Sequence, residues 1–205
     1  MRAILKRGLP LAALGLAGWA YVLASQGRAL EAFGTGAIGL LALSIGAMLR
    51  SPMAGAFVAS LGGVCISAYL TLTKLITEMP GYQAVCSGND SFDCGAVTSS
   101  AWSEIAGLPT ALWALAFYLG LSLVSYKSWR ERPGYPLAGV FVFGCGITAA
   151  SFSGFMALES SKLGSWCPFC IGLYGVSVLV LVAGFLAARE HGYLDAMGQV
   201  VRGQG

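Results

Sequence analysis

The sequence predicts an all-α integral membrane protein with about six spans, and its composition and its long apolar stretches indicate this class. Of its 205 residues, 57% are hydrophobic and 10% are charged, against roughly 45–50% and about 25% in soluble domains. A soluble domain covers its surface with charged side chains, and this chain has too few of them. Six spans of about 20 residues need about 120 apolar positions, which the chain supplies. We therefore do not expect a disordered chain, a nucleic-acid-binding protein or a soluble enzyme.

Six apolar stretches are candidates for these spans, because a helix satisfies its own backbone hydrogen bonds in lipid. They are Leu9–Ala24, Ala29–Leu49, Met53–Leu75, Leu108–Tyr126, Leu137–Leu158 and Pro168–Ala188. The first stretch is short and follows basic residues, so it is either a span or a signal peptide. In the third stretch, small residues recur every four positions and predict close helix packing. They are Gly55, Ala59, Gly63, Ser67 and Thr71.

The basic residues predict the orientation, because Lys and Arg are enriched in cytoplasmic loops. With the N-terminus inside, nine of the 12 basic residues fall on the cytoplasmic side. They are Arg2, Lys6, Arg7, Arg50, Lys127, Arg130, Arg132, Arg189 and Arg202. Both termini are therefore expected in the cytoplasm, and the long connection 76–107 is expected outside. This divides the chain into an N-terminal two-helix hairpin (1–52), a bundle (53–188) and a cytoplasmic tail (189–205).

Cysteines are the main source of candidate chemistry, since the single histidine, His191, cannot supply a histidine-based triad or metal cage. Cys86 and Cys94 lie in the external connection. Cys167 and Cys170 lie at the start of the last span, on the same side of the membrane. Because this is the oxidising side, we expect disulfide or redox chemistry there.

The last span begins with Cys167-Pro168-Phe169-Cys170. Proline suits the first helical position, so Cys167 is predicted at the N-cap and Cys170 as the third helical residue. Free N–H groups and the positive end of the helix dipole favour a thiolate there; the alternative is a buried structural pair. Tyr174 lies one turn beyond Cys170 on the same face. Its phenol can hydrogen-bond a carbonyl of an oxidised ligand, or it can anchor the helix at the interface.

The segment between Cys86 and Cys94 is short, polar and glycine-containing, which suits a mobile disulfide that exchanges between partners. A static disulfide is the alternative. A zinc site of all four cysteines is less favoured, because this spacing exceeds the usual two to four intervening residues. After Cys94, a short helix is predicted to lie on the bundle as a lid. Its apolar face would contain Val97, Ala101, Trp102 and Ile105.

These motifs together resemble the vitamin K epoxide reductase family over roughly residues 53–188. The shared features are two loop cysteines, a serine after the second, Gly107-Leu108-Pro109 before the next span, and Cys-x-x-Cys followed by tyrosine. The cysteine order differs from that of DsbB-type quinone reductases, in which the Cys-x-x-Cys pair comes first. The resemblance implies a four-helix bundle around a quinone. Carried over residue by residue, it makes Cys86 and Cys94 a shuttle pair, Cys167 and Cys170 the active-site pair, and Ser100 and Tyr174 quinone contacts.

The chain departs from the family pattern in three places. Animal members carry an asparagine early in the second core span, where this chain has Pro109 and Thr110, so epoxide reduction is not expected. Many bacterial members carry a fused thioredoxin-like domain, whereas this chain ends soon after the last predicted span. We therefore expect a separate partner protein. The hairpin 1–52 has no counterpart in the four-helix core.

The resemblance implies a thiol:quinone oxidoreductase that generates disulfides. Electrons would pass from a reduced, DsbA-like thioredoxin-fold protein through the two cysteine pairs to menaquinone, ubiquinone or a similar quinone. A bacterial inner membrane is expected, with the active site on the extracytoplasmic face. The alternative is an endomembrane, in which Asn89 would be a glycosylation acceptor.

Two other functions remain open at this point. A CcdA-like conduit would carry electrons across the membrane through Cys65 and Cys145, two cysteines within spans. Packing is the default interpretation for both, because free cysteine is among the most commonly buried residue types. The second alternative is a non-catalytic membrane scaffold stabilised by two disulfides.

Overall fold

The computed structural model describes residues 29–77, 87–89, 92–93, 97, 100–131 and 137–190. Most of these residues are helical, which confirms the predicted helical class. The helices are α2 (Ala29–Met48), α3 (Pro52–Thr77), α5 (Thr110–Arg130), α6 (Ala138–Leu163) and α7 (Pro168–Glu190). Between α3 and α5 lie β1 (Ser87–Asn89), β2 (Phe92–Asp93), the 3-10 helix η1 (Ala101–Ser103), β3 (Glu104–Ile105) and β4 (Leu108–Pro109).

Each predicted apolar stretch from residue 29 onward forms a helix, while the first, Leu9–Ala24, and His191 lie outside the described residues. α5 begins two residues later than predicted, because Leu108 and Pro109 form a strand. α6 continues beyond its apolar run and ends where Gly164 adopts the left-handed conformation, with φ of 69°. This is the usual way in which glycine ends a helix.

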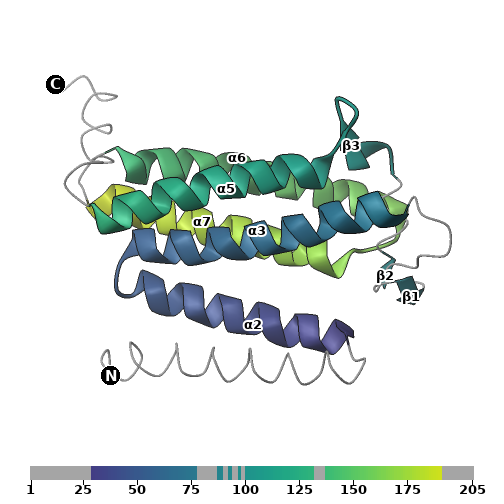
Figure 1. The fold of residues 1–205 in the computed structure, drawn as a ribbon, viewed down its shortest axis with the longest axis horizontal. Coiled ribbons are helices and arrows are strands. Elements are labelled where there is room, and N and C mark those ends of the chain that lie inside the picture. Colours follow the sequence, from purple (N-terminus) through teal and green to yellow (C-terminus); the bar gives the residue numbers. More distant parts are fainter. Residues whose placement is uncertain are drawn as a thin grey trace.

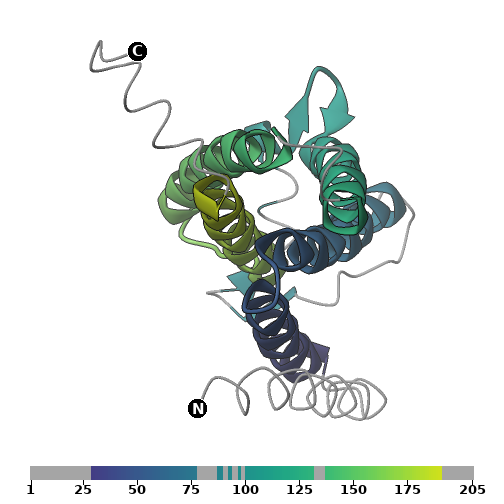
Figure 2. The same cartoon turned by 90° about the vertical axis from the view of Figure 1, so that its left-hand side faces the viewer.

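α3, α5, α6 and α7 form a bundle, which Figure 2 shows end-on. α3 packs against α5 and α7, α6 packs against α7, and α2 packs on the outer side of α3. α5 and α6 contact each other much less than the other neighbouring helices of the bundle do. The seam between α5 and α6 is therefore the loosest part of the bundle.

Small residues fill the inside of the bundle. Ala59 and Ser67 of the predicted packing stripe are fully buried, so its role in packing is confirmed. A Cβ on Gly146 would lie 2.5 Å from the Cα of Leu181, and one on Gly184 would lie 2.5 Å from the backbone nitrogen of Phe143. α6 and α7 therefore meet at backbone contact, which is typical of membrane helices.

Large apolar side chains lie on the outside of the same helices. Leu123 is 64% exposed and Leu158 is 65% exposed, whereas soluble proteins bury most of their leucines. Three of the described helices, α3, α6 and α7, are long and apolar enough to cross a membrane. α5 has 21 residues and is about 31 Å long at 1.5 Å per residue, but its C-terminal half carries Ser122, Ser125 and Lys127, which lower its hydropathy.

Candidate functional site

The Cys-x-x-Cys pair lies at the N-terminus of α7, as predicted. α7 begins at Pro168. The carbonyl of Cys167 accepts the first helical hydrogen bond from the Ile171 N–H, with an N···O distance of 3.0 Å, as an N-cap carbonyl does. Cys170 is therefore the third residue of the helix, and the local geometry inferred from the motif is confirmed.

The two cysteines, which are free thiols in this structure, interact directly. The backbone N–H of Cys170 donates to the Cys167 sulfur at 3.4 Å. A hydrogen bond from the Cys170 thiol lowers the pKa of Cys167, burial opposes this by raising it, and the backbone N–H groups of Cys170 and Phe169 lower it further. The pKa of Cys167 is lowered overall, so this sulfur is predisposed to carry a negative charge.

The outer side of Cys167 is covered by residues from α3 and from the loop that precedes η1. Cys167 is 1% exposed and packs with Leu70 and Val97. The Ser100 hydroxyl donates to the Val97 carbonyl at 2.8 Å and so stabilises this loop. Cys167 therefore packs against Val97, which lies three residues beyond the second loop cysteine in the sequence.

The two loop cysteines, Cys86 and Cys94, lie outside the described residues. The strands next to them in the sequence are described: Ser87 of β1 pairs with Asp93 of β2 in an antiparallel ladder. Across the described ranges no group of three or more His, Cys, Asp or Glu side chains is placed to hold a metal ion. The four-cysteine zinc alternative includes the two loop cysteines and so is not tested by this finding.

A cavity of about 410 Å³ lies inside the bundle beside Cys170. Its walls come from α3, α5, α6 and α7, and most of its lining is apolar. The polar side chains that reach it are Lys74, Ser103, Thr110, Tyr118, Thr148, Ser153, Tyr174 and Ser177. A volume of a few hundred Å³ with an apolar wall and a few polar groups is typical of small-molecule sites.

The two predicted quinone contacts are placed differently. Tyr174 lines the cavity together with Cys170, as its position on the same helix face predicts. Ser100 is not among the described residues that line the cavity. The structure thus brings Cys170 and Tyr174 together on one wall of the cavity, whereas neither Cys167 nor Ser100 is among the described residues that line it.

The segment over the cavity was predicted to be a short helix. This prediction is wrong from Glu104 onward. The chain makes one turn of 3-10 helix and then a hairpin, in which Ile105 of β3 pairs with Leu108 of β4. Ala106 and Gly107 link the strands with φ of 55° and 75°, and two successive positive φ angles are what a tight two-residue hairpin turn needs. Ser103 and Ile105 line the cavity, so the hairpin does lie over it.

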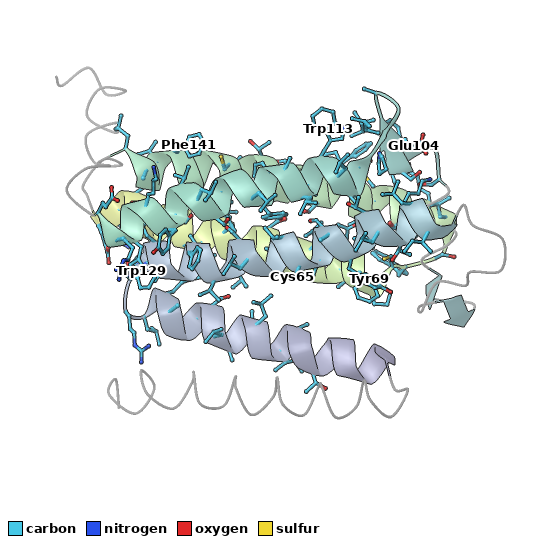
Figure 3. All side chains as sticks on the ribbon, in the orientation of Figure 1. Cys65, Tyr69, Glu104, Trp113, Trp129 and Phe141 are labelled. Atoms are coloured by element: carbon cyan, nitrogen blue, oxygen red, sulfur yellow. The ribbon has the colours of Figure 1, made fainter. Side chains whose placement is uncertain are left out.

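Hydrogen bonds and an ion pair hold this hairpin against the bundle. The Thr110 hydroxyl donates to the Trp102 carbonyl at 2.8 Å, and the Trp113 indole donates to the Ile105 carbonyl at 3.2 Å. Lys74 of α3 reaches Glu104 at 3.2 Å. Figure 3 shows Glu104 and Trp113 at this end of the molecule. The lid is therefore joined to both α3 and α5.

Sequence reasoning missed a cluster of hydroxyl groups at the cavity wall. Tyr118 of α5, Ser153 of α6 and Ser177 of α7 meet there, and all three line the cavity. The signal was partly present, because Ser177 lies seven residues beyond Cys170 and three beyond Tyr174, on one helix face. The contribution of α5 and α6 could not be found from the sequence, since it depends on how each helix is rotated.

The two cysteines within spans lie away from this site. Cys65 of α3 is exposed on the bundle surface. Cys145 of α6 is partly buried and packs against the hydrophobic core. Neither is among the described residues that line the cavity.

In a comparison with known protein families, the model of the vitamin K epoxide reductase family matches residues 53–185. The match begins at the second residue of α3 and ends within α7. It therefore covers the four-helix bundle, the lid and the cavity, and it leaves α2 outside.

Proposed function

Because the chain belongs to the vitamin K epoxide reductase family, a membrane family with disulfide and quinone redox activity, we propose that it is a thiol:quinone oxidoreductase that generates disulfides. The observation that carries the proposal is the position of the Cys-x-x-Cys pair. Cys170 lines an apolar cavity, while Cys167 packs against Val97 in the connection between α3 and α5. A pair between a loop and a cavity is suited to pass electrons from one to the other.

The proposed reaction begins at the loop cysteines. A thiolate of a reduced thioredoxin-fold partner attacks the Cys86–Cys94 disulfide at Cys86, and Cys94 leaves as a thiolate. Cys94 then attacks Cys167 of the second disulfide, and Cys170 leaves as a thiolate at the cavity. The partner's second thiol completes the partner's own disulfide and releases Cys86. Each step is a thiol–disulfide exchange that moves one electron pair.

The lowered pKa of Cys167 supports the next step. Cys86 attacks Cys94 in the Cys94–Cys167 mixed disulfide, so that the loop disulfide forms again and Cys167 leaves as a thiolate. A thiol of lower pKa is the faster leaving group in such an exchange. Cys170 first takes up a proton, which the partner's second thiol releases when the partner's disulfide closes. The hydrogen bonds that Cys167 then receives from the Cys170 thiol and the helix N–H groups favour its release. The result is a dithiol beside the cavity.

The cavity suits a quinone ring in size and in chemistry. It is mostly apolar, and the phenol of Tyr174 is available on the same wall as Cys170 to donate to a carbonyl oxygen. A bound quinone would supply an acceptor for two electrons and two protons as the dithiol closes to a disulfide. Ser100 remains a proposed contact from the family resemblance; its described role is the hydrogen bond to Val97.

We also propose six spans with both termini in the cytoplasm of a bacterial cell and the cysteine end outside. The distribution of basic residues supports this orientation. The C-terminal ends of α2, α5 and α7 lie at one end of the bundle in Figure 1, opposite the end where α7 begins. Basic residues lie at or next to these helix ends in the sequence: Arg50, Lys127, Arg130 and Arg189. Cytoplasmic enrichment of such residues is the general rule. The divisions 1–52, 53–188 and 189–205 are retained as proposed units, and α2 outside the family match supports the first boundary.

The test uses the purified chain in lipid nanodiscs with a reduced thioredoxin-fold protein and ubiquinone or menaquinone, followed by quinone absorbance. We expect catalytic quinol formation that is lost in Cys170→Ala. The matched control is Cys65→Ala with Cys145→Ala, which should keep full activity because neither residue reaches the cavity. Full activity in Cys170→Ala would overturn the proposal, and loss of activity in the control would favour a conduit through the spans.

A further inference from the structure

Three hydroxyl groups from three helices meet at the cavity wall, one turn beyond Tyr174. The Ser177 hydroxyl lies 2.8 Å from the Tyr118 hydroxyl and 2.9 Å from the Ser153 hydroxyl. Tyr118 and Ser177 are 2% and 1% exposed, so their hydrogen bonds cannot be exchanged freely with water. We call Tyr118, Ser153 and Ser177 the hydroxyl cluster.

The ring of Tyr118 is held in place by the absence of a side chain on α3. A Cβ at Gly63 would lie 2.6 Å from the Tyr118 ring, so the ring lies directly against the α3 backbone. This contact fixes the tyrosine from one side and Ser177 fixes its hydroxyl from the other. The oxygen is therefore positioned by α3 and α7 together.

The hydrogen atoms of the cluster can be assigned by counting donors and acceptors. A hydroxyl has one hydrogen to donate and two lone pairs to accept with. Ser177 donates to the carbonyl of Leu173 at 3.0 Å, so it can accept from both Tyr118 and Ser153. One of these two donors can turn its hydrogen into the cavity while Ser177 still accepts from the other. The cluster can thus present either a donor or an acceptor to a ligand.

Ser177 of the hydroxyl cluster lies on the same face of α7 as Cys170 and Tyr174. Ser177 follows Tyr174 by three residues, which is a rise of about 4.5 Å at 1.5 Å per residue. All of these residues line one cavity. We propose that the hydroxyl cluster binds the oxygen of a 1,4-quinone ring that is para to the oxygen bound by Tyr174. This inference rests on the proposed quinone function and assigns its second polar contact.

Such a cluster suits both redox forms of the ligand. A carbonyl oxygen accepts a hydrogen bond, and the cluster supplies one by rotating Tyr118 or Ser153. A quinol hydroxyl donates one, and the cluster accepts it on the oxygen of the same residue when its hydrogen returns to Ser177. No proton is gained or lost by the cluster in this change. The dithiol of Cys167 and Cys170 releases the two electrons and two protons when it closes.

The test is infrared spectroscopy of 2,3-dimethyl-1,4-naphthoquinone bound to the oxidised protein, in which both disulfides are closed and no electron transfer occurs. The two carbonyls of the free probe give one stretching band, and a hydrogen bond lowers its frequency. We expect two lowered bands in the wild type. Tyr174→Phe should return one band to the free frequency, and the double variant Tyr118→Phe with Ser153→Ala should return the other. The double variant should also weaken binding about tenfold, as loss of one buried hydrogen bond does.

The controls separate the two proposals. Ser122→Ala removes a buried hydroxyl one turn from Tyr118 that donates to its own helix and should leave both bands unchanged. A return of one band in Tyr174→Phe, with no change in the double variant, would overturn the role of the cluster and leave the quinone site intact. No lowered band in the wild type would overturn the quinone site itself. If the double variant does not fold, Tyr118→Phe and Ser153→Ala are measured separately, and a second band that neither variant shifts would overturn the proposal.

Discussion

The two ends of the bundle use the same helices but are packed in opposite ways. At the end that holds Trp129 and Phe141 in Figure 3, α6 and α7 meet at backbone contact, and Phe57 packs against Trp129 with ring centroids 6.2 Å apart. At the end that holds Trp113 and Glu104, the same helices surround a cavity of about 410 Å³. The difference indicates that one end maintains the bundle, which leaves the other free to hold a ligand.

The largest effect is expected from overfilling the closed end. Gly184→Leu would place a side chain against the backbone of Phe143. The backbone nitrogen of Phe143 lies only 2.5 Å from where a Cβ on residue 184 would be. We expect a loss of about 3 kcal/mol or more in the free energy of unfolding, because overpacking a backbone contact forces helices apart. Gly144→Leu is the control, since no atom lies within 4 Å of its Cβ. Denaturant unfolding in detergent measures both, and equal stability of the two variants would contradict the comparison.

Filling the open end should change binding and leave stability unchanged. Ala114→Phe adds a ring at a position that lines the cavity, so we expect the KM for quinone to rise at least tenfold at unchanged thermal stability. Ala116→Phe makes the same change on the exposed face of α5 and should leave the KM unchanged. A KM for quinone in Ala114→Phe equal to that of the wild type would show that this cavity is not the binding site.

A smaller effect concerns the charge on Cys167 at the open end. The first cause of its lowered pKa is the hydrogen bond from the Cys170 thiol, so Cys170→Ala should raise the pKa of Cys167. Cys170→Ser can still donate and should keep it lower than Ala does. Thiolate absorbance against pH, with the other cysteines replaced, measures this difference. If the helix N–H groups alone lowered the pKa of Cys167, the Ala and Ser variants would show the same pKa, which would contradict this prediction.

The lowered pKa of Cys167 also makes the stability of the reduced protein depend on pH. The folded-state pKa of Cys167 is depressed, so its contribution is fully present above the unfolded-state pKa and is lost as pH falls through the folded-state pKa. The reduced protein should therefore lose this contribution on acidification in wild type, and lose less of it in Cys170→Ala. Unfolding of the reduced protein at a series of pH values tests the sign.

The smallest effect is expected at the lid. Glu104 is 50% exposed at its side chain where it pairs with Lys74, and exposed ion pairs contribute about 0.2–1 kcal/mol. Glu104→Gln should therefore change stability by less than about 1 kcal/mol, and the difference from wild type should shrink at high salt. A large loss of stability would mean that the ion pair, rather than the hydrogen bonds of Thr110 and Trp113, holds the hairpin.

The sequence predicted those parts of the molecule that depend on one segment at a time. Apolar runs located the helices, and the proline after Cys167 located the helix start and the Cys170 thiol. The lid hairpin was missed because its turn needs a positive φ at Ala106, and alanine rarely adopts a positive φ. The hydroxyl cluster was missed because Tyr118, Ser153 and Ser177 come from three helices whose rotations are decided by packing. Ser100 matched the family motif in sequence, yet its hydroxyl bonds the neighbouring loop carbonyl.

The central claim, that the Cys167–Cys170 pair gives its electrons to a quinone in the adjacent cavity, can be tested in a single turnover. The variant Cys86→Ala with Cys94→Ala removes the loop pair. Of the four cysteines that remain, Cys65 and Cys145 do not line the cavity, and Cys167 and Cys170 form the pair at α7. Reduced with a small thiol, freed of it and mixed with excess quinone, it should form one quinol per chain, and none when Cys170→Ala is added. No quinol from the loop-pair variant, or an unchanged yield after Cys170→Ala, would contradict the account.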